Sequence, residues 1–260
     1  MSKRRKGALS LAADFVAAPR RAMDRVAAEP RAALVDALKI LLAYMAVSAV
    51  FYALKPESFP PPAEGAAPPD DPRGILFWTK VQLWTPALDA VLVATTAWFA
   101  QLLKGDRLPR RLLAAVLCGA APVLLLIVYA QSRIPGWAFA CGWLLFAALA
   151  APGFRRVPAQ TWAPLAAVLL GVNALSLTLV PLFTAAVLAR WAVGYHALEM
   201  GLLLWTLGIS TYGAGRLLGL PAARAFCAVF LGLLAQIVFV FSMHTLGLLP
   251  NDVLKALMAV

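Results

Sequence analysis

The sequence predicts an all-α fold, a polytopic bundle of transmembrane helices, and three observations lead to this prediction. Of the 260 residues, 62% are hydrophobic and 13% are charged, with a mean hydropathy of +0.81, whereas a soluble domain carries about 25% charged residues. The chain divides at its charged residues into about seven apolar stretches, the length of helices that cross a bilayer. Lys and Arg are concentrated in alternate gaps between these stretches. The spans leave no room for a separate catalytic domain.

Residues 1–31 form a basic cytoplasmic segment ahead of the bundle. Apolar residues such as Phe15 and Met23 recur at roughly helical spacing, which predicts an amphipathic helix on the membrane surface, broken at Pro19. The basic residues of this segment are candidate contacts for anionic lipids or for a protein partner: Lys3, Arg4, Arg5, Lys6, Arg20, Arg21, Arg25 and Arg31.

The transmembrane bundle is predicted over residues 32–249, followed by a short tail, 250–260. A Pro-rich external loop, 55–74, follows the first span, and the fifth span is long enough to tilt or to kink at Pro181. The fourth span has only 17 residues, and if it is re-entrant the count is six and the C-terminus lies inside. Five spans remain a further alternative. The predicted spans are 32–54, 75–103, 111–130, 135–151, 161–189, 195–215 and 222–249.

The distribution of basic residues predicts the orientation. Sixteen of the 23 Lys and Arg lie in the N-terminal segment and in the gaps after the second, fourth and sixth spans, counting Arg111 and Arg224 at the start of the spans that follow, against five in the other gaps and the tail. The positive-inside rule therefore predicts a cytoplasmic N-terminus and an external C-terminus. The Ala-, Arg- and Pro-rich composition is typical of a high-GC bacterium, so we expect the bacterial cytoplasmic (inner) membrane.

The net charge of +11 fits this bias and attraction to anionic lipid, and it does not predict nucleic-acid binding, because no aromatic-basic platform lies outside the spans. Aromatic residues near the span ends, Tyr195 among them, predict an interfacial aromatic belt.

Ionisable residues within the spans are the candidate functional residues, because charge inside a membrane is costly. Asp36 and Lys39, three residues apart, predict a local ion pair at the inner interface. Asp89 lies deeper in the second span, and the predicted topology places His196, Glu199 and His244 at a similar depth.

These last four residues form a candidate proton or cation site, for which carboxylates and imidazoles are suitable groups. The alternative is that they are polar residues near helix ends, with Asp89 hydrogen-bonded between helices. The residue types do not decide whether a metal would bind. No phosphate loop, nucleophile elbow or metalloprotease motif occurs, which predicts a non-enzymatic protein without a cofactor.

Three local segments resemble the Yip-one family of Ypt/Rab-GTPase-interacting membrane proteins, in particular its bacterial branch. They are FVAAPRRAMDRVAAEPRAAL from Phe15, RRLLAAVLCGAAPVLLL from Arg110 and LGLPAARAFCAVFLGLL from Leu218. The resemblance implies a polytopic bundle with a cytoplasmic N-terminus and a role in membrane organisation or protein interaction. The family usually has about five spans, against the seven predicted here.

The sequence therefore leads to two functional hypotheses. The first is a non-enzymatic membrane scaffold or interaction protein of the Yip-one type. The alternative is a small transporter or channel for protons or cations that uses Asp89, His196, Glu199 and His244.

Overall fold

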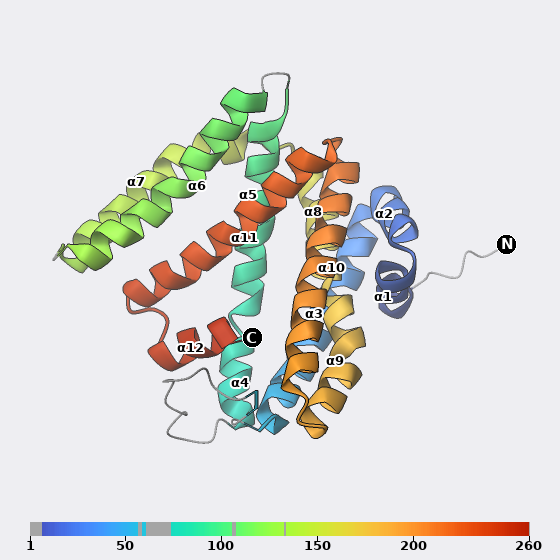
Figure 1. Cartoon of the computed structure of the whole chain (residues 1–260). Coiled ribbons are helices and arrows are strands. Elements are labelled where there is room, and N and C mark those ends of the chain that lie inside the picture. Colours follow the sequence, from blue (N-terminus) through green and yellow to red (C-terminus); the bar gives the residue numbers. More distant parts are fainter. Residues whose placement is uncertain (1–6, 57–58, 61–73, 106–107, 133, 260) are drawn as a thin grey trace. The chain divides into compact units, whose positions relative to one another are not determined.

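The computed structural model of the chain describes residues 7–56, 59–60, 74–105, 108–132 and 134–259, and over these residues it contains helices and no strands (Figure 1). The predicted all-α fold is confirmed. Seven helical segments are long and apolar enough to cross a membrane, and each coincides with a predicted span: Pro30–Leu54, Ile75–Leu103, Pro109–Gln131, Gly136–Arg155, Ala159–Leu188, Ala192–Leu218 and Ala222–Thr245. The chain is thus a multi-pass integral membrane protein.

Three predicted span details differ from the structure. The fourth helix is 20 residues long, because it continues through Pro152 to Arg155. The fifth segment breaks at Val172, between two helices, and Pro181 lies inside the second of them. The seventh helix ends at Thr245, because Gly247 adopts a left-handed conformation (φ 74°) and the N–H of Leu248 bonds back to the carbonyl of Met243.

The chain folds as two compact units, Met1–Thr85 with Ala167–Ser210, and Pro86–Ala166 with Thr211–Val260. The first unit is built around α3 (Pro30–Leu54), which contacts α1 (Ala8–Ala17), α2 (Pro19–Ala28), α4 (Ile75–Gln82) and α9 (Asn173–Leu188). The first part of α10 (Ala192–Leu218), as far as Ser210, also belongs to it.

Proline sets the helix boundaries of the N-terminal segment. Pro19 and Pro30 occupy the first positions of α2 and α3, where a missing N–H costs nothing. The preceding residues, Ala18 and Glu29, leave the helical region, as a residue before proline prefers. The predicted break at Pro19 is therefore present, and α1, α2 and α3 are three separate helices (Figure 1).

The apolar sides of α1 and α2 are covered by protein. Leu11, Phe15, Met23 and Val26 are fully buried, and α1 packs against both α3 and α9. A ring carbon of Phe15 lies so close to Gly171 that a Cβ there would overlap it. The sequence predicts that this apolar side lies on the membrane surface, whereas in the structure the first unit itself buries it.

The second unit contains α5 (Thr85–Leu103) from Pro86 onward, together with α6 (Leu108–Gln131), α7 (Gly136–Arg155), α11 (Ala222–Thr245) and α12 (Asn251–Ala259). It also holds the first part of α8 (Ala159–Gly171), up to Ala166, and the last turns of α10. Within it, α6 packs against α7 and α11, and α11 against α12.

Glycine allows α11 to pack closely within this unit. A Cβ at Gly232 would overlap the hydroxyl of Thr96 on α5, and a Cβ at Gly119 on α6 would lie 3.3 Å from Leu231. Close packing at small residues is how helices associate where lipid removes the hydrophobic driving force. By contrast, α6 and α7 expose large apolar side chains, such as Leu117 (60%) and Leu149 (73%). These are surfaces suited to lipid.

Candidate functional site

An ammonium group lies among aromatic rings at the end of α3 in the first unit. Lys55 follows the last residue of α3, and its Nζ donates a 3.4 Å hydrogen bond to the hydroxyl of Tyr195 on α10. The same Nζ lies 5.2 Å from the ring centroid of Tyr52 and 5.1 Å from that of Tyr195. Both distances are within the range of cation–π attraction, which strengthens where water is excluded.

Tyr195 is the centre of this arrangement. Its side chain is 1% exposed, and the rings of Phe59 and Phe183 meet it edge-on at centroid distances of 5.4 and 5.2 Å. The expectation that Tyr195 belongs to an interfacial aromatic belt is therefore wrong. Residues of α9, α10 and the segment after α3 bury it in one aromatic cluster.

The predicted pair of His196 and Glu199 adjoins this cluster. Nδ1 of His196 lies 3.0 Å from Oε2 of Glu199, as the three-residue spacing on α10 predicts. Tyr195 also interacts electrostatically with Glu199 and with Tyr52. We call these five residues, Tyr52, Lys55, Tyr195, His196 and Glu199, the Lys55 cluster. It holds two polar contacts, Lys55 with Tyr195 and His196 with Glu199, beside an aromatic core.

Two opposed effects act on the charge of Lys55. Burial lowers the pKa of its amine below the ordinary value of 10.5, and the carboxylate of Glu199 raises it by a smaller amount. The neutral amine is therefore more accessible for Lys55 than for a solvated lysine. The cluster can bind an anionic group at Lys55 and move a proton between His196 and Glu199.

The other two predicted site residues lie in the second unit. Asp89 is half-buried on α5, and Nδ1 of His244, near the end of α11, lies 2.9 Å from the carbonyl of Leu249. The single cluster of Asp89, His196, Glu199 and His244 stays a prediction. Within the described ranges, no three His, Cys, Asp or Glu side chains gather in a way that could hold a metal ion.

The basic N-terminal segment contains a second polar centre, also in the first unit. Nη2 of Arg25 lies 2.6 Å from Oδ2 of Asp36, and Nη1 donates a 2.8 Å hydrogen bond to the hydroxyl of Ser10. Arg25 on α2 thus joins Ser10 on α1 to Asp36 on α3. We call these three residues and their contacts the N-terminal clamp. Lys39 lies 3.8 Å from Asp36, so the predicted ion pair is present, but Arg25 is the closer partner.

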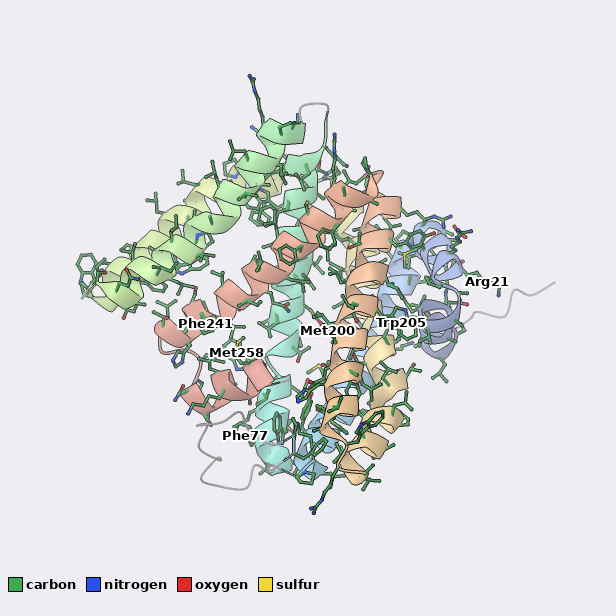
Figure 2. All side chains as sticks on the ribbon, in the orientation of Figure 1. Arg21, Phe77, Met200, Trp205, Phe241 and Met258 are labelled. Atoms are coloured by element: carbon green, nitrogen blue, oxygen red, sulfur yellow. The ribbon has the colours of Figure 1, made fainter. Side chains whose placement is uncertain are left out.

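The remaining predicted contact residues of the segment divide into two groups. Arg20, Arg21 and Arg31 are exposed, and Figure 2 shows Arg21 on the outward side of α2. The predicted contacts Lys3, Arg4, Arg5 and Lys6 lie outside the described residues.

Sequence reasoning missed Lys55, Tyr52 and the partnership of Arg25 with Asp36. One signal was available: Tyr52 and Lys55 are three residues apart, and Tyr195 and Glu199 are four apart, so each pair shares a helix face. No signal in the chain shows that these two pairs meet.

Comparison of the chain with protein-family models, with curated proteins and with solved structures found no match.

Proposed function

We propose that the chain is a non-enzymatic membrane protein of the Yip-one type, which organises the bacterial inner membrane or holds a protein partner through its basic N-terminal helices. The observation that carries this proposal is the N-terminal clamp. It fixes α1 and α2 on α3 with their apolar sides inward, and it leaves Arg20, Arg21 and Arg31 exposed. We call these three arginines the basic platform.

The basic platform acts by charge rather than by insertion. An amphipathic helix that enters a membrane needs its apolar side free, and here that side is covered by α3 and α9. Contact with anionic lipid headgroups or with an acidic protein surface is then electrostatic, worth about 1 kcal/mol per basic residue near such a surface. Such contact weakens as salt shortens the Debye length.

The test is photo-crosslinking in the native membrane. A photoreactive residue replaces Ala27, which is exposed on α2, in the wild-type background and in the Arg20→Gln/Arg21→Gln/Arg31→Gln variant. The proposal expects discrete cross-linked proteins in the wild type that disappear in the triple variant and at high salt. The Lys80→Gln variant, which removes an exposed charge on α4, is the matched control and should change nothing. Cross-links that are absent, or that survive the triple substitution, would contradict the proposal.

Deletion of residues 1–31 is a poor test of the same idea. It would remove Leu11, Phe15 and Met23 and so uncover the apolar surfaces of α3 and α9 that they fill. A truncated chain would lose partners through disorder or gain them through exposed apolar surface. The charge substitutions keep this packing.

A second candidate function is a small proton or cation transporter, which the 3.0 Å contact of His196 with Glu199 favours. A carboxylate and an imidazole within hydrogen-bond distance can exchange a proton. Proton flux in proteoliposomes that falls in both Glu199→Gln and Asp89→Asn, but not in the exposed-site control Asp252→Asn, would support it. Wild-type vesicles that carry no flux above empty ones would rule it out.

A further inference from the structure

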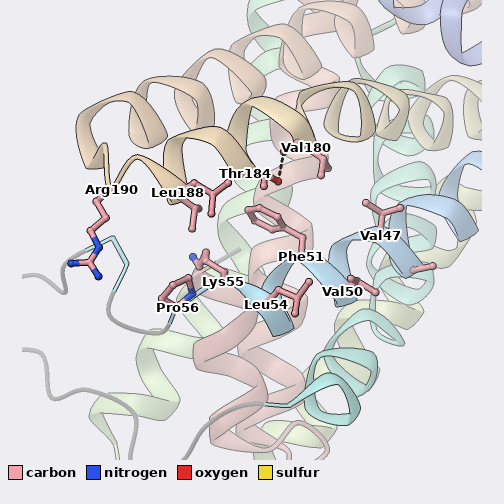
Figure 3. Close-up of a pocket in the computed structure, with 12 residues that line it drawn as sticks. Val47, Val50, Phe51, Leu54, Lys55, Pro56, Val180, Thr184, Leu188 and Arg190 are labelled. Carbon is pink, nitrogen blue, oxygen red and sulfur yellow. Dashed lines mark hydrogen bonds between the residues drawn. The ribbon is translucent and has the colours of Figure 1, made fainter.

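The first unit has an apolar groove between α3 and α9. Its volume is about 780 Å³, within the range of pockets that enclose drug-sized ligands. Val47, Val50 and Leu54 line it from α3, and Val180 and Val187 line it from α9 (Figure 3). The hydroxyl of Thr184 donates to the carbonyl of Val180 at 2.9 Å, so this lining residue offers the groove little polarity.

Two cations stand at one end of this groove. Figure 3 shows Lys55 and Arg190 at the same end, with Val47 and Val180 toward the other. None of the 12 lining residues is acidic. Arg190 is exposed, and among the described residues it makes no ion pair. The groove is therefore amphipathic along its length, apolar for most of it and basic at one end.

The backbone of Arg190 supports a role for its side chain. Its φ of 51° lies in the left-handed region that favours glycine. Arg190 follows the end of α9, and its backbone N–H donates to the carbonyl of Val187 at 3.0 Å. A helix commonly ends with glycine at such a position. An arginine that occupies it at a conformational cost is a reason to look for function at that residue.

We propose that this groove binds one anionic phospholipid, with an acyl chain along α3 and α9 and the headgroup phosphate at Lys55 and Arg190. The dimensions agree: from Ala46 to Lys55 the wall of α3 rises about 14 Å at 1.5 Å per residue. One leaflet of a bilayer occupies about half of the ~30 Å hydrocarbon core. The groove thus matches the depth of one leaflet, with its cations at headgroup level.

The charges select the headgroup. Guanidinium binds phosphate through paired, charge-assisted hydrogen bonds, and the ammonium of Lys55 supplies a second positive charge. A zwitterionic lipid would bring its own cation to a site that already holds two. A lipid of net negative charge brings no such cation, so the two basic side chains favour it, although the carboxylate of Glu199 also acts on Lys55. The inference extends beyond the proposed function, because the groove and the basic platform share no residue.

The experiment is native mass spectrometry of the full chain, purified in mild detergent and titrated with phosphatidylglycerol or phosphatidylcholine. We expect phosphatidylglycerol to bind about tenfold more tightly. The Lys55→Gln/Arg190→Gln variant should lose this preference, and the control Lys80→Gln/Lys255→Gln, which removes two exposed charges elsewhere, should keep it. Equal binding of both lipids by the wild type would overturn the proposal.

A groove-filling variant separates this site from general surface charge. Val50 lines the groove and is 50% exposed, so Val50→Trp can fill the groove without entering the core. With both cations in place, this variant should also lose about tenfold in phosphatidylglycerol affinity, the loss expected when about two acyl CH₂ groups are displaced from apolar contact. Unchanged affinity would mean that lipid binds elsewhere, and the proposal would fall. Each variant is first checked for a wild-type melting temperature, and Val50→Leu replaces any tryptophan variant that fails.

Discussion

The guanidinium of Arg25 lies 2.6 Å from the carboxylate of Asp36, and this contact holds α2 against α3. Both side chains are largely buried, at 18% and 12% exposure. The pair also decides which residues of the N-terminal segment meet the surroundings. With the contact in place, Phe15 and Met23 are buried and Arg21 is exposed.

Loss of this pair should loosen α1 and α2. In Arg25→Ala, Asp36 loses its closer cationic partner and Ser10 loses a hydrogen-bond donor, so we expect a loss of about 2–3 kcal/mol in the free energy of unfolding. Thermal unfolding in detergent measures it, and limited trypsin digestion should cleave earlier near Arg20. The control Arg21→Ala, at an exposed position, should stay within about 0.5 kcal/mol. Equal losses of stability in Arg25→Ala and Arg21→Ala would show that the Arg25–Asp36 pair does not stabilise the packing of α2 on α3.

Gly171 should tolerate no side chain, because Phe15 fills the space beside it. A Cβ there overlaps the ring of Phe15, which is fully buried and cannot move away freely. Gly171→Ala should therefore lower the free energy of unfolding by about 1–3 kcal/mol, the usual cost of overpacking. Chemical denaturation followed by tryptophan fluorescence measures the loss.

Two further variants test the cause of that loss. Combining Gly171→Ala with Phe15→Leu should recover part of the stability, because the smaller side chain makes room. Gly201→Ala is the matched control, since nothing lies within 4 Å of a Cβ there, and alanine should be neutral or stabilising by about 0.5–1 kcal/mol in that helix. A Gly171→Ala protein as stable as the wild type would mean that α1 does not pack on α8 and α9 as described.

The side chain of Arg224 should contribute to the free energy of unfolding of the second unit. Its Nη1 donates to the carbonyl of Leu103, the last residue of α5, and to the carbonyl of Gly105 two residues later. Arg224→Ala should cost about 1–3 kcal/mol, the range for a charged hydrogen bond to a partly buried group. The melting temperature in detergent is the measurement. Arg216→Ala removes an exposed arginine of the same hairpin and should change the melting temperature far less. A larger decrease in Arg216→Ala than in Arg224→Ala would refute the stabilising role of Arg224.

Local sequence signals predicted where the helices lie. They did not predict which helices pack together, because that depends on contacts between residues far apart in the chain. Pro19 and Pro30 set helix starts by their own geometry, and the pair of His196 with Glu199 follows from their spacing. The cover over the apolar side of α1 was not predictable, because Gly171 lies far along the chain from Phe15.

The same reasoning explains what the sequence revealed of the candidate site. Lys55 and Tyr195 are 140 residues apart, and no spacing rule joins them. The sequence predicted that Lys55 lies in the external loop, whereas in the structure its Nζ lies between the rings of Tyr52 on α3 and Tyr195 on α10. Pairings within one helix are therefore predictable here, and pairings between helices are not.

The amine of Lys55 should titrate at lower pH than the exposed lysines of the chain. Burial lowers its pKa from 10.5, and Glu199 opposes this. Because the unfolded chain then binds the proton more strongly, the contribution of Lys55 to stability rises with pH between the lowered pKa and 10.5. Reductive methylation with ¹³C-formaldehyde and NMR titration in micelles should show one lysine signal, absent in Lys55→Gln, that titrates below the rest. Glu199→Gln removes the opposing carboxylate, so it should move that signal further down. A Lys55 signal that titrates together with the other lysine signals, or whose pKa rises in Glu199→Gln, would contradict the described burial of Lys55 beside Glu199.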